Sequence, residues 1–367
     1  DLLAKSTGMG KGAKAAAATS GNLCAFNPVT RAKYTADSLG GTVPVISSDY
    51  EYQVLIPWGT PIKPGVPEYA GDPNTRPLST EQEQQIGIGH DGMWLFTENG
   101  NSNKEGVLCI NHEFGTNPHV LNKSFPESLD DVRLSQAAHG CSVVKVAKDQ
   151  NEKWDVDVND KRNRRITVNT LMEFDGPVAG SDFLVNEANN PPLGTVNNCG
   201  NGYTPWGTYL TCEENFNGYF GSTDPNFAPE EGSKQERYGF SSTGFGYGWH
   251  VFDERFDLSN PDYANEYNRF GWIVEIDPQN PNKAPVKHTA LGCFKHEGIA
   301  IRETQTGKIH CYMGDDQRFD YCYKFVSKYS WKKAISRGQS PLAEGTLYVA
   351  RFNDDGTGDW LELSMNN

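Results

Sequence analysis

The sequence has few positive charges and no long apolar run, and each shortage argues against a class of protein. Its 367 residues contain 33 lysines and arginines against 47 aspartates and glutamates, which gives a formal net charge of −14. A surface of that sign repels nucleic-acid phosphates on average, so we expect no DNA or RNA partner. No uninterrupted apolar run reaches about 18 residues, and we therefore expect no membrane-spanning helix.

Several motifs that would identify an enzyme class or a metal site are also missing. None of the eight cysteines forms a C-x-x-C pair, which disfavours a zinc ribbon. Residues 155–166 begin like a calcium loop but lack the glycine and the final glutamate of an EF-hand. There is no H-E-x-x-H zinc motif and no G-x-S-x-G nucleophile elbow. A covalent serine hydrolase therefore has no support.

The N-terminal segment lacks the apolar core of a signal peptide. Residues 1–23 are rich in alanine and glycine, as expected of a mature end left after export or of a flexible leader. We expect a flexible leader over residues 1–49 and a β-propeller-type catalytic domain over residues 50–367.

What the chain does contain is a series of short strand-like segments between turns of glycine, proline, asparagine and aspartate. Its 16 tyrosines, 18 phenylalanines and 8 tryptophans favour sheets over helices. Helical patterns are confined to 79–86 and 127–140, and 215–247 is expected to be a long loop insertion. The predicted fold class is all-β, a propeller with irregular blades. The expected strands include 52–57, 93–97, 105–113, 141–148, 153–158, 207–212, 248–252, 271–277, 308–314, 321–326 and 346–352.

Acidic residues recur near the ends of several of these segments. Hard cations such as calcium take six to eight oxygen ligands, and ferric iron also accepts a thiolate or an imidazole. Carboxylates that converge at one mouth of a β-scaffold would hold several metal ions, which could activate an oxygen nucleophile near neutral pH. Each acidic residue alone is more often a solvated turn residue, and a strand cysteine is more often part of the core. The acidic segments are GIGHDGM at 87–93, CINHE at 109–113, TCEEN at 211–215, CFKHEG at 293–298 and YMGDDQRF at 312–319.

These segments resemble the PhoX-type alkaline phosphatases. The matching pieces keep the family's order between about residues 50 and 350, and TPWGTYLTCEEN at 204–215 is the longest. The resemblance implies a six-bladed β-propeller with a cluster of ferric iron (Fe3+) and calcium ions at its mouth. It implies hydrolysis of phosphate monoesters, and export through the twin-arginine route to a secreted or periplasmic location. Since family members continue past the match, we expect the propeller to be incomplete in this chain.

The resemblance also implies a set of metal-binding carboxylates. Glu213 and Glu297 are expected to be the central, catalytic metal-bridging residues, with Glu113 and Asp315 as further metal ligands. Side chains alternate between the two faces of a strand, so Glu213 and Glu214 should differ. We expect Glu213 to be the inner ligand and Glu214 to be a structural carboxylate.

Four more residues are assigned from the same resemblance. Asn111 and Lys295 are expected to hold the phosphate of the substrate, with Lys295 also catalytic. Lys295 stands where the family uses arginine, which replaces a bidentate fork by a point charge. The iron ligand that completes the carboxylate set is expected to be either the thiolate of Cys109 or the imidazole of His90.

Two rival functions remain open at this stage. The first is a non-catalytic β-scaffold for binding or structure whose site has decayed, and this protein would contain no metal. The second is a calcium-dependent propeller lactonase or phosphotriesterase, which would use one catalytic calcium and no iron. Metal content separates the first rival from a phosphatase, and a panel of substrates separates the second.

Overall fold

The structure is a computed structural model that describes residues 27, 46–72, 74–98 and 103–364. The chain divides into two compact units, residues 1–55 and residues 56–367. In the described part of the first unit, the backbone N–H of Asn27 donates to Asp49 Oδ2 at 2.6 Å. Most of the expected leader at 1–49 lies outside the described residues.

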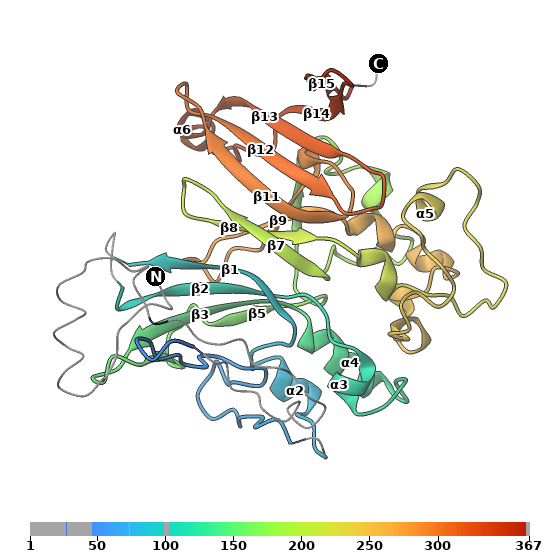
Figure 1. The fold of residues 1–367 in the computed structure, drawn as a ribbon. Helices are drawn as coiled ribbons and strands as arrows, with labels where there is room; N and C mark the ends of the chain where they lie inside the picture. The colour runs from blue at the N-terminus through green and yellow to red at the C-terminus, as the bar shows by residue number, and fades with distance from the viewer. Residues whose placement is uncertain (1–26, 28–45, 73, 99–102, 365–367) are drawn as a thin grey trace. The chain divides into compact units, whose positions relative to one another are not determined.

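Three five-stranded sheets follow one another along the second unit (Figure 1). In the first sheet the strands run in the order β1-β2-β3-β4, and β5 also pairs with β3. All of its pairs are antiparallel, and β2 and β3 are almost entirely buried because they carry apolar runs such as VLCI and VV. Its strands are β1 His90–Thr97, β2 Glu105–His112, β3 Gly140–Lys148, β4 Trp154–Val156 and β5 Arg164–Ile166.

The second sheet has the order β6-β10-β9-β8-β7, and only its β6–β10 pair is parallel. The third sheet is a meander, β11-β12-β13-β14-β15, with antiparallel pairs throughout. The strands of the second sheet are β6 Glu173–Asp175, β7 Asn198–Tyr203, β8 Tyr209–Glu213, β9 Ile273–Ile276 and β10 Val286–His288. Those of the third sheet are β11 His296–Glu303, β12 Lys308–Asp315, β13 Cys322–Ser330, β14 Gly345–Phe352 and β15 Gly358–Glu362.

Helices in the described residues are short and lie in the connections. The longest, α4, begins after Ser128, whose side chain accepts a hydrogen bond from the Asp131 N–H as an N-cap. The α-helices are α2 Ser79–Gln82, α3 Asn117–Leu121, α4 Leu129–Ala138, α5 Lys234–Arg237 and α6 Trp331–Ser336. The 3-10 helices are η2 Asp182–Leu184, η3 Phe216–Tyr219, η4 Trp249–Val251, η5 Glu254–Phe256, η6 Pro261–Tyr263, η7 Glu266–Arg269 and η8 Thr289–Leu291.

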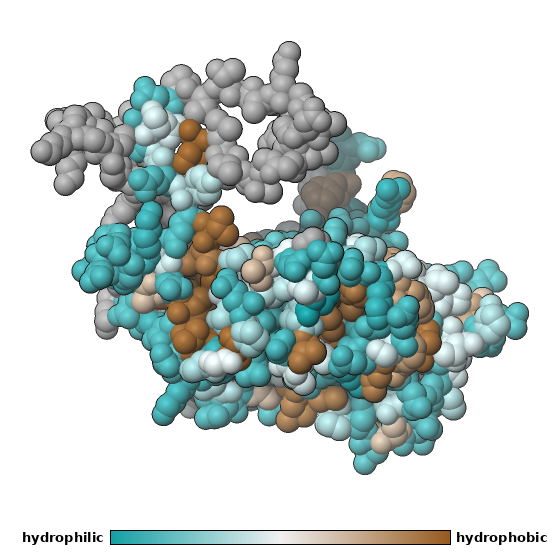
Figure 2. All heavy atoms as spheres, turned by 90° about the horizontal axis from the view of Figure 1, so that it is seen from below, coloured by the Kyte–Doolittle hydropathy of each residue, from teal (hydrophilic) through white to brown (hydrophobic). Residues whose placement is uncertain are grey.

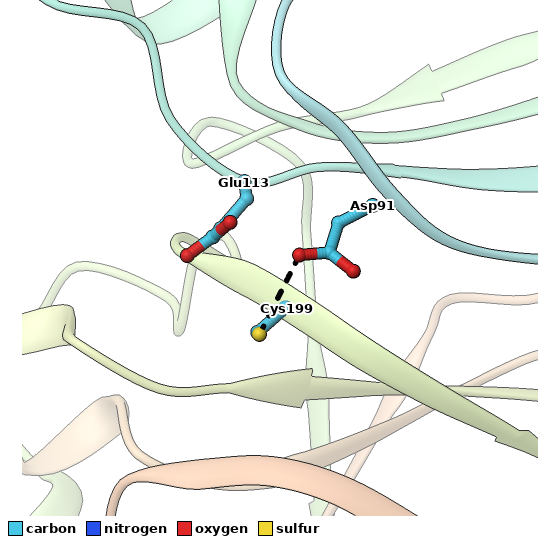
Figure 3. A group of neighbouring side chains, drawn as sticks. All are labelled: Asp91, Glu113 and Cys199. Atoms are coloured by element: carbon cyan, nitrogen blue, oxygen red, sulfur yellow. Dashed lines mark hydrogen bonds between the residues drawn. The ribbon is translucent and has the colours of Figure 1, made fainter. Parts of the chain in front are cut away.

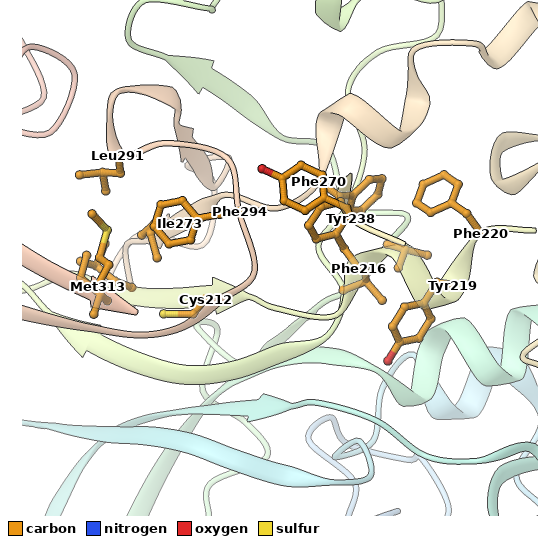
Figure 4. Close-up of a cluster of buried hydrophobic side chains, with 14 of the residues drawn as sticks. Cys212, Phe216, Tyr219, Phe220, Tyr238, Phe270, Ile273, Leu291, Phe294 and Met313 are labelled. Carbon is orange, nitrogen blue, oxygen red and sulfur yellow. The ribbon is translucent and has the colours of Figure 1, made fainter. Parts of the chain in front are cut away.

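The largest hydrophobic core joins the second and third sheets to the long connection after β8 (Figure 4). The expected loop insertion at 215–247 is therefore not only surface: Phe216 and Phe220 are buried in this core. Cys212 is buried in the same core with Ile273 and Met313, as a small apolar residue. The segment 215–247 therefore contributes buried side chains to the core beside the second sheet.

The edge strands of the three sheets lie against one another, with β7 between β1 and β11. Glycine makes this close approach possible at two equivalent positions. A Cβ atom on Gly92 would lie 2.8 Å from the carbonyl oxygen of Cys199, and one on Gly200 would lie 2.3 Å from that of Glu297. Any larger residue at these positions would force the sheets apart.

The prediction is confirmed as far as a mostly β fold with three sheets, while a closed propeller is not found among the described residues. Two expected strands are wrong. Residues 52–57 have no regular structure, and 248–252 contain the 3-10 helix η4. Gly248 has φ +70°, a left-handed conformation that ends an extended run, and Trp249 is buried in the core.

The described surface is mixed in character. Figure 2 shows hydrophobic residues in separate groups among hydrophilic ones on the face seen from below. None of the helices in the described part of the chain has both the length and the apolar character that crossing a bilayer requires.

Candidate metal site

The edge strand of each sheet brings one potential metal ligand to a common place. Asp91, Cys199 and Glu297 are the second residues of β1, β7 and β11. In all three strands the pairing register is interrupted directly after the first residue. Such a bulge re-aims the side chain that it contains. A bulge at the same position of each edge strand therefore directs one potential metal ligand from each of the three sheets.

The neighbouring strand of each sheet adds a second ligand at the same place. Glu113, Glu214 and Asp316 directly follow the last residues of β2, β8 and β12. In each sheet the last residue of this strand pairs with the first residue of the edge strand. The register therefore fixes each of the three carboxylates beside the ligand of its own edge strand.

Three of these side chains meet within metal-binding distance (Figure 3). One ligand atom from each of Asp91, Glu113 and Cys199 lies within 4.8 Å of the other two. The Cys199 thiol is 3.6 Å from Asp91 Oδ2. Burial and then the neighbouring Asp91 carboxylate raise the pKa of Glu113 to about 8. A cation bound nearby would favour the charged form of the Glu113 carboxylate.

Electrostatic interactions join the other three side chains to this group. Burial and then a hydrogen bond to Asp316 raise the pKa of Glu214 to about 7, and Glu297 adds a further repulsion. Burial, Glu113 and Asp91 raise the pKa of the Cys199 thiol well above its usual value. We call the set the acidic cluster. Its members are Asp91, Glu113, Cys199, Glu214, Glu297 and Asp316.

Lys295 is the cation placed beside the acidic cluster. Its side chain is buried, and its nearest charged partners include Asp315, Glu214 and Asp316. Burial lowers the pKa of Lys295, and these carboxylates oppose the shift. Among the described residues no partner accepts a hydrogen bond from its ammonium, which leaves the group able to donate to a ligand. The backbone N–H of Asp316 donates to the Lys295 carbonyl oxygen at 3.1 Å and fixes the two residues together.

Glu213 lies away from the acidic cluster, on the opposite face of β8 from Glu214. Its side chain is fully buried, with Oε1 2.7 Å from Lys287 Nζ. Its Oε2 accepts hydrogen bonds from the backbone N–H groups of Gly271 and Trp272 at 2.9 and 3.0 Å. Both carboxylate oxygens are occupied within the protein, so the structure gives Glu213 a supporting position and not the expected inner one.

Asn111 also lies behind the site. It is fully buried, and its amide nitrogen donates to the carbonyl oxygens of Cys199 and Gly200 at 2.6 and 3.0 Å. Its side-chain oxygen accepts a hydrogen bond from the Tyr209 hydroxyl at 3.0 Å. With these bonds made, Asn111 anchors the β7 bulge that carries Cys199 and has no group left for phosphate.

The two residues expected to complete the iron site lie elsewhere. Cys109 is completely buried in the core of the first sheet, where burial raises the pKa of its thiol far above the usual value. His90 Nε2 lies 2.9 Å from the Ile56 carbonyl oxygen, and its ring packs against His112. Asp315 directly precedes Asp316 of the cluster. Its Oδ1 accepts the Gln317 N–H at 3.0 Å, while its buried Oδ2 has no hydrogen-bond partner in the described part of the chain.

The sequence contains a signal for all six members of the acidic cluster, of which only Glu113 and Glu297 were predicted as metal ligands. Asp91, Cys199 and Glu297 each precede a glycine in the short motifs HDG, NCG and HEG. The other three members, Glu113, Glu214 and Asp316, occur in the motifs NHEF, CEEN and GDDQ. The motifs differ in ligand type and spacing, so they do not form a recognisable repeat. Only the shared bulge and register show that they are equivalent.

Comparisons with known proteins identify a family and a solved structure that this chain is similar to. A family model described as "Alkaline phosphatase PhoX" matches residues 30–367. The solved structure of Pseudomonas fluorescens PhoX in complex with vanadate, a transition state analogue, is similar with a TM-score of 0.79 and 40% sequence identity. The similarity covers 87% of this chain and 56% of that chain, so this chain spans little more than half of that protein. A search of curated proteins found no match.

Proposed function

The chain belongs to the PhoX alkaline phosphatase family, and from this membership we propose that the acidic cluster is the site of phosphate monoester hydrolysis. The observation that carries the proposal is the convergence of Asp91, Glu113 and Cys199 from two sheets. Electrostatic interactions join Glu214, Glu297 and Asp316 to this group. The Pseudomonas fluorescens PhoX structure holds vanadate, which supports a phosphate-like ligand for this family.

The acidic cluster fits the metals that the family implies. Glu214 is buried, and the other five members are half-buried or exposed. Lys295 is also buried, and its charged neighbours include Glu214 and Asp316. Burial, and then hydrogen bonds and repulsion between the carboxylates, raise the pKa values of Glu113 and Glu214, and a bound cation would oppose these shifts. The buried Asp315 Oδ2, which has no hydrogen-bond partner among the described residues, points to the same need.

We propose that the thiol-containing group Asp91, Glu113 and Cys199 holds iron, because ferric iron accepts both carboxylate and thiolate ligands. The all-oxygen group Glu214, Glu297 and Asp316 is suited to calcium. When bound, these ions would neutralise charge, polarise a phosphoryl oxygen and lower the pKa of a water molecule.

Lys295 is proposed to bind the phosphate of the substrate. Its ammonium can donate to a phosphoryl oxygen as negative charge redistributes during the reaction. A lysine provides a point charge where an arginine would provide two parallel donors, so we expect orientation of the phosphate to depend mainly on the rest of the cluster. The proximity of Asp315 and Asp316 favours the protonated form of Lys295.

Glu213 and Asn111 are proposed to position the cluster without contacting substrate. Glu213 fixes the end of β8 through its contacts to Gly271, Trp272 and Lys287, and so sets the direction of Glu214. Asn111 on β2 fixes the position of Cys199 on β7 through its hydrogen bond to the Cys199 carbonyl oxygen.

The three sheets are proposed to be blades of a six-bladed propeller, since their edge strands lie side by side. Gly298 occupies the position equivalent to Gly92 and Gly200, yet a Cβ there would meet nothing within 4 Å among the described residues. A further sheet could pack at this side of β11. Family membership also supports export to the periplasm or the exterior through the twin-arginine route.

The experiment is phosphate release from 4-nitrophenyl phosphate by protein supplied with iron and calcium, before and after treatment with a calcium chelator. We expect activity that the chelator abolishes and added calcium restores. A diester, a triester and a lactone tested in parallel would separate a monoesterase from the lactonase or phosphotriesterase alternative. Activity that survives chelation, or a folded protein that binds neither metal, would overturn the proposal.

A further inference from the structure

The connection between β12 and β13 carries an aromatic side chain in an unusual setting. Phe319 is 99% exposed and has φ +70°. Its ring gains nothing from burial, and a left-handed backbone conformation is unfavourable for a bulky residue. A residue that is both strained and apolar at the surface calls for a functional explanation.

The surrounding loop holds this conformation firmly. The Asp320 N–H donates to the Gln317 carbonyl oxygen at 3.0 Å, which closes a turn around Phe319. The Asp315 N–H donates to the Tyr321 carbonyl oxygen at 3.1 Å at the base of the loop. Asp320 also pairs with Arg237, 3.0 Å away. The position of Phe319 is therefore fixed by its neighbours and does not depend on contacts of its own ring.

The loop begins inside the acidic cluster. Asp316, three residues before Phe319, interacts with Glu214 through its side chain and with Lys295 through its backbone. A second exposed aromatic residue, Phe114, directly follows Glu113 and is 49% exposed. Two uncovered phenylalanines thus follow cluster carboxylates that come from different sheets.

We propose that Phe319, supported by Phe114, determines specificity by stacking on a planar aromatic leaving group, so that the site prefers nucleoside monophosphates over phosphate esters of simple sugars. The inference rests on the proposed phosphatase function. Phosphate binding at Lys295 and the cluster would place the ester oxygen at the rim, where the rest of the substrate extends towards the loop. A base stacked on an aromatic side chain is sequestered from water without any hydrogen bond that would select one base.

Adenosine 5′-monophosphate and ribose 5-phosphate form a suitable pair of substrates, because they share the 5′ ester oxygen and the second carries a hydroxyl at C1 in place of the base. We expect kcat/KM for the nucleotide to exceed that for the sugar phosphate by about tenfold. Competition binding of the same two compounds, measured without turnover, is expected to show the same preference.

Variants of Phe319 separate the effect of its aromatic ring from the effect of its backbone conformation. Phe319→Ala is expected to reduce the preference to less than about threefold and to leave ribose 5-phosphate turnover unchanged. Phe319→Gly should lose the preference equally while its thermal unfolding midpoint rises by about 1–3 °C, because glycine accepts the left-handed conformation. Phe319→Trp should retain the preference. The matched control is Phe352→Ala, since Phe352 is 79% exposed at the end of β14 in the same sheet.

The outcomes distinguish this inference from the proposed function. If the wild-type protein hydrolyses both compounds at equal rates, or if Phe319→Ala leaves the ratio unchanged, the specificity role is refuted and the phosphatase function stands. If it hydrolyses neither, the proposed function fails, and equal binding of the two compounds would then refute the specificity role independently. An equal loss of preference in Phe352→Ala would also refute it.

Discussion

Glu213 and Lys287 form a fully buried ion pair, with 2.7 Å between Oε1 and Nζ, directly behind the acidic cluster. Burial raises the pKa of Glu213 and lowers that of Lys287, so each group depends on the other to remain charged. Lys287 also donates to the Arg269 carbonyl oxygen at 2.7 Å. The adjacent glutamates therefore have different surroundings: Glu213 is bonded within the protein at the end of β8, and Glu214 interacts with the carboxylates of the acidic cluster.

Replacing Glu213 is predicted to affect folding first. Glu213→Gln leaves the ammonium of Lys287 buried without a counter-charge, and we expect a loss of about 3–5 kcal/mol in the free energy of unfolding. Urea titration followed by fluorescence measures it. The double variant Glu213→Leu with Lys287→Met should recover only part of that loss, because the two charges are removed together but the N–H groups of Gly271 and Trp272 lose their acceptor. A single variant as stable as the wild type would contradict a supporting role.

Replacing Glu214 is predicted to reduce metal content and activity without reducing the stability of the metal-free protein. Glu214→Gln removes one of several repelling carboxylates, so the metal-free protein should be as stable as the wild type or slightly more stable, by up to about 1 kcal/mol. Metal content and phosphatase activity should both fall, activity by at least about 100-fold. Elemental analysis and phosphate release provide the measurements. Full metal content in this variant would remove Glu214 from the cluster.

Asn111 is predicted to act on metal affinity through Cys199. Asn111→Ala removes both donors to the β7 bulge and leaves two carbonyl oxygens unsatisfied, so we expect about 2–4 kcal/mol of destabilisation. Iron affinity should decrease by about 10- to 100-fold, as for other residues that orient a metal ligand. Iron titration of the variant at a temperature where it remains folded tests this. Unchanged iron affinity would show that the bulge does not need the amide.

Stability is predicted to decrease at alkaline pH because of His288. Its ring lies between two carboxylates, with Nδ1 2.8 Å from Asp175 and Nε2 2.9 Å from Glu275, and these raise the pKa of His288 to about 9 against the effect of burial. A raised pKa contributes stability in full below about pH 6.5, and that contribution is lost as pH rises through 9. The loss amounts to at most about 3 kcal/mol.

Urea unfolding at pH 7 and pH 10 measures this dependence, with His288→Asn as the comparison. The variant should be less stable than the wild type at pH 7 and should change less between the two pH values. Equal pH dependence of the two proteins would show that another group is responsible.

The sequence predicted the fold class and the neighbourhood of the site better than the individual ligands. Strands with β-branched and aromatic runs, such as those ending at His112 and Asp315, were found because burial requires that composition. The edge strands β7 and β11 were not predicted. For β7 the reason is its sequence, NCGNGY, since asparagine and glycine are depleted in strands. Its glycines are needed for contact with β11, which only the three-dimensional structure reveals.

The choice between Glu213 and Glu214 could not be made from alternation. Alternation correctly placed the two side chains on opposite faces of β8, but it does not state which face is the core. The deciding partner, Lys287, is distant in sequence on β10. Cys199 was overlooked for a similar reason, since its companions Asp91 and Glu113 come from another sheet.

The most direct test of the account is the visible absorption of the iron-loaded protein. A bond between ferric iron and a thiolate gives an intense charge-transfer band, so we expect the wild-type protein to be coloured and Cys199→Ser to lose the band. Cys109→Ser is the matched control, because Cys109 is buried in the core of the first sheet, and it should keep the band. A band that persists in Cys199→Ser, or one that disappears in Cys109→Ser alone, would contradict the assignment of the acidic cluster as the metal site.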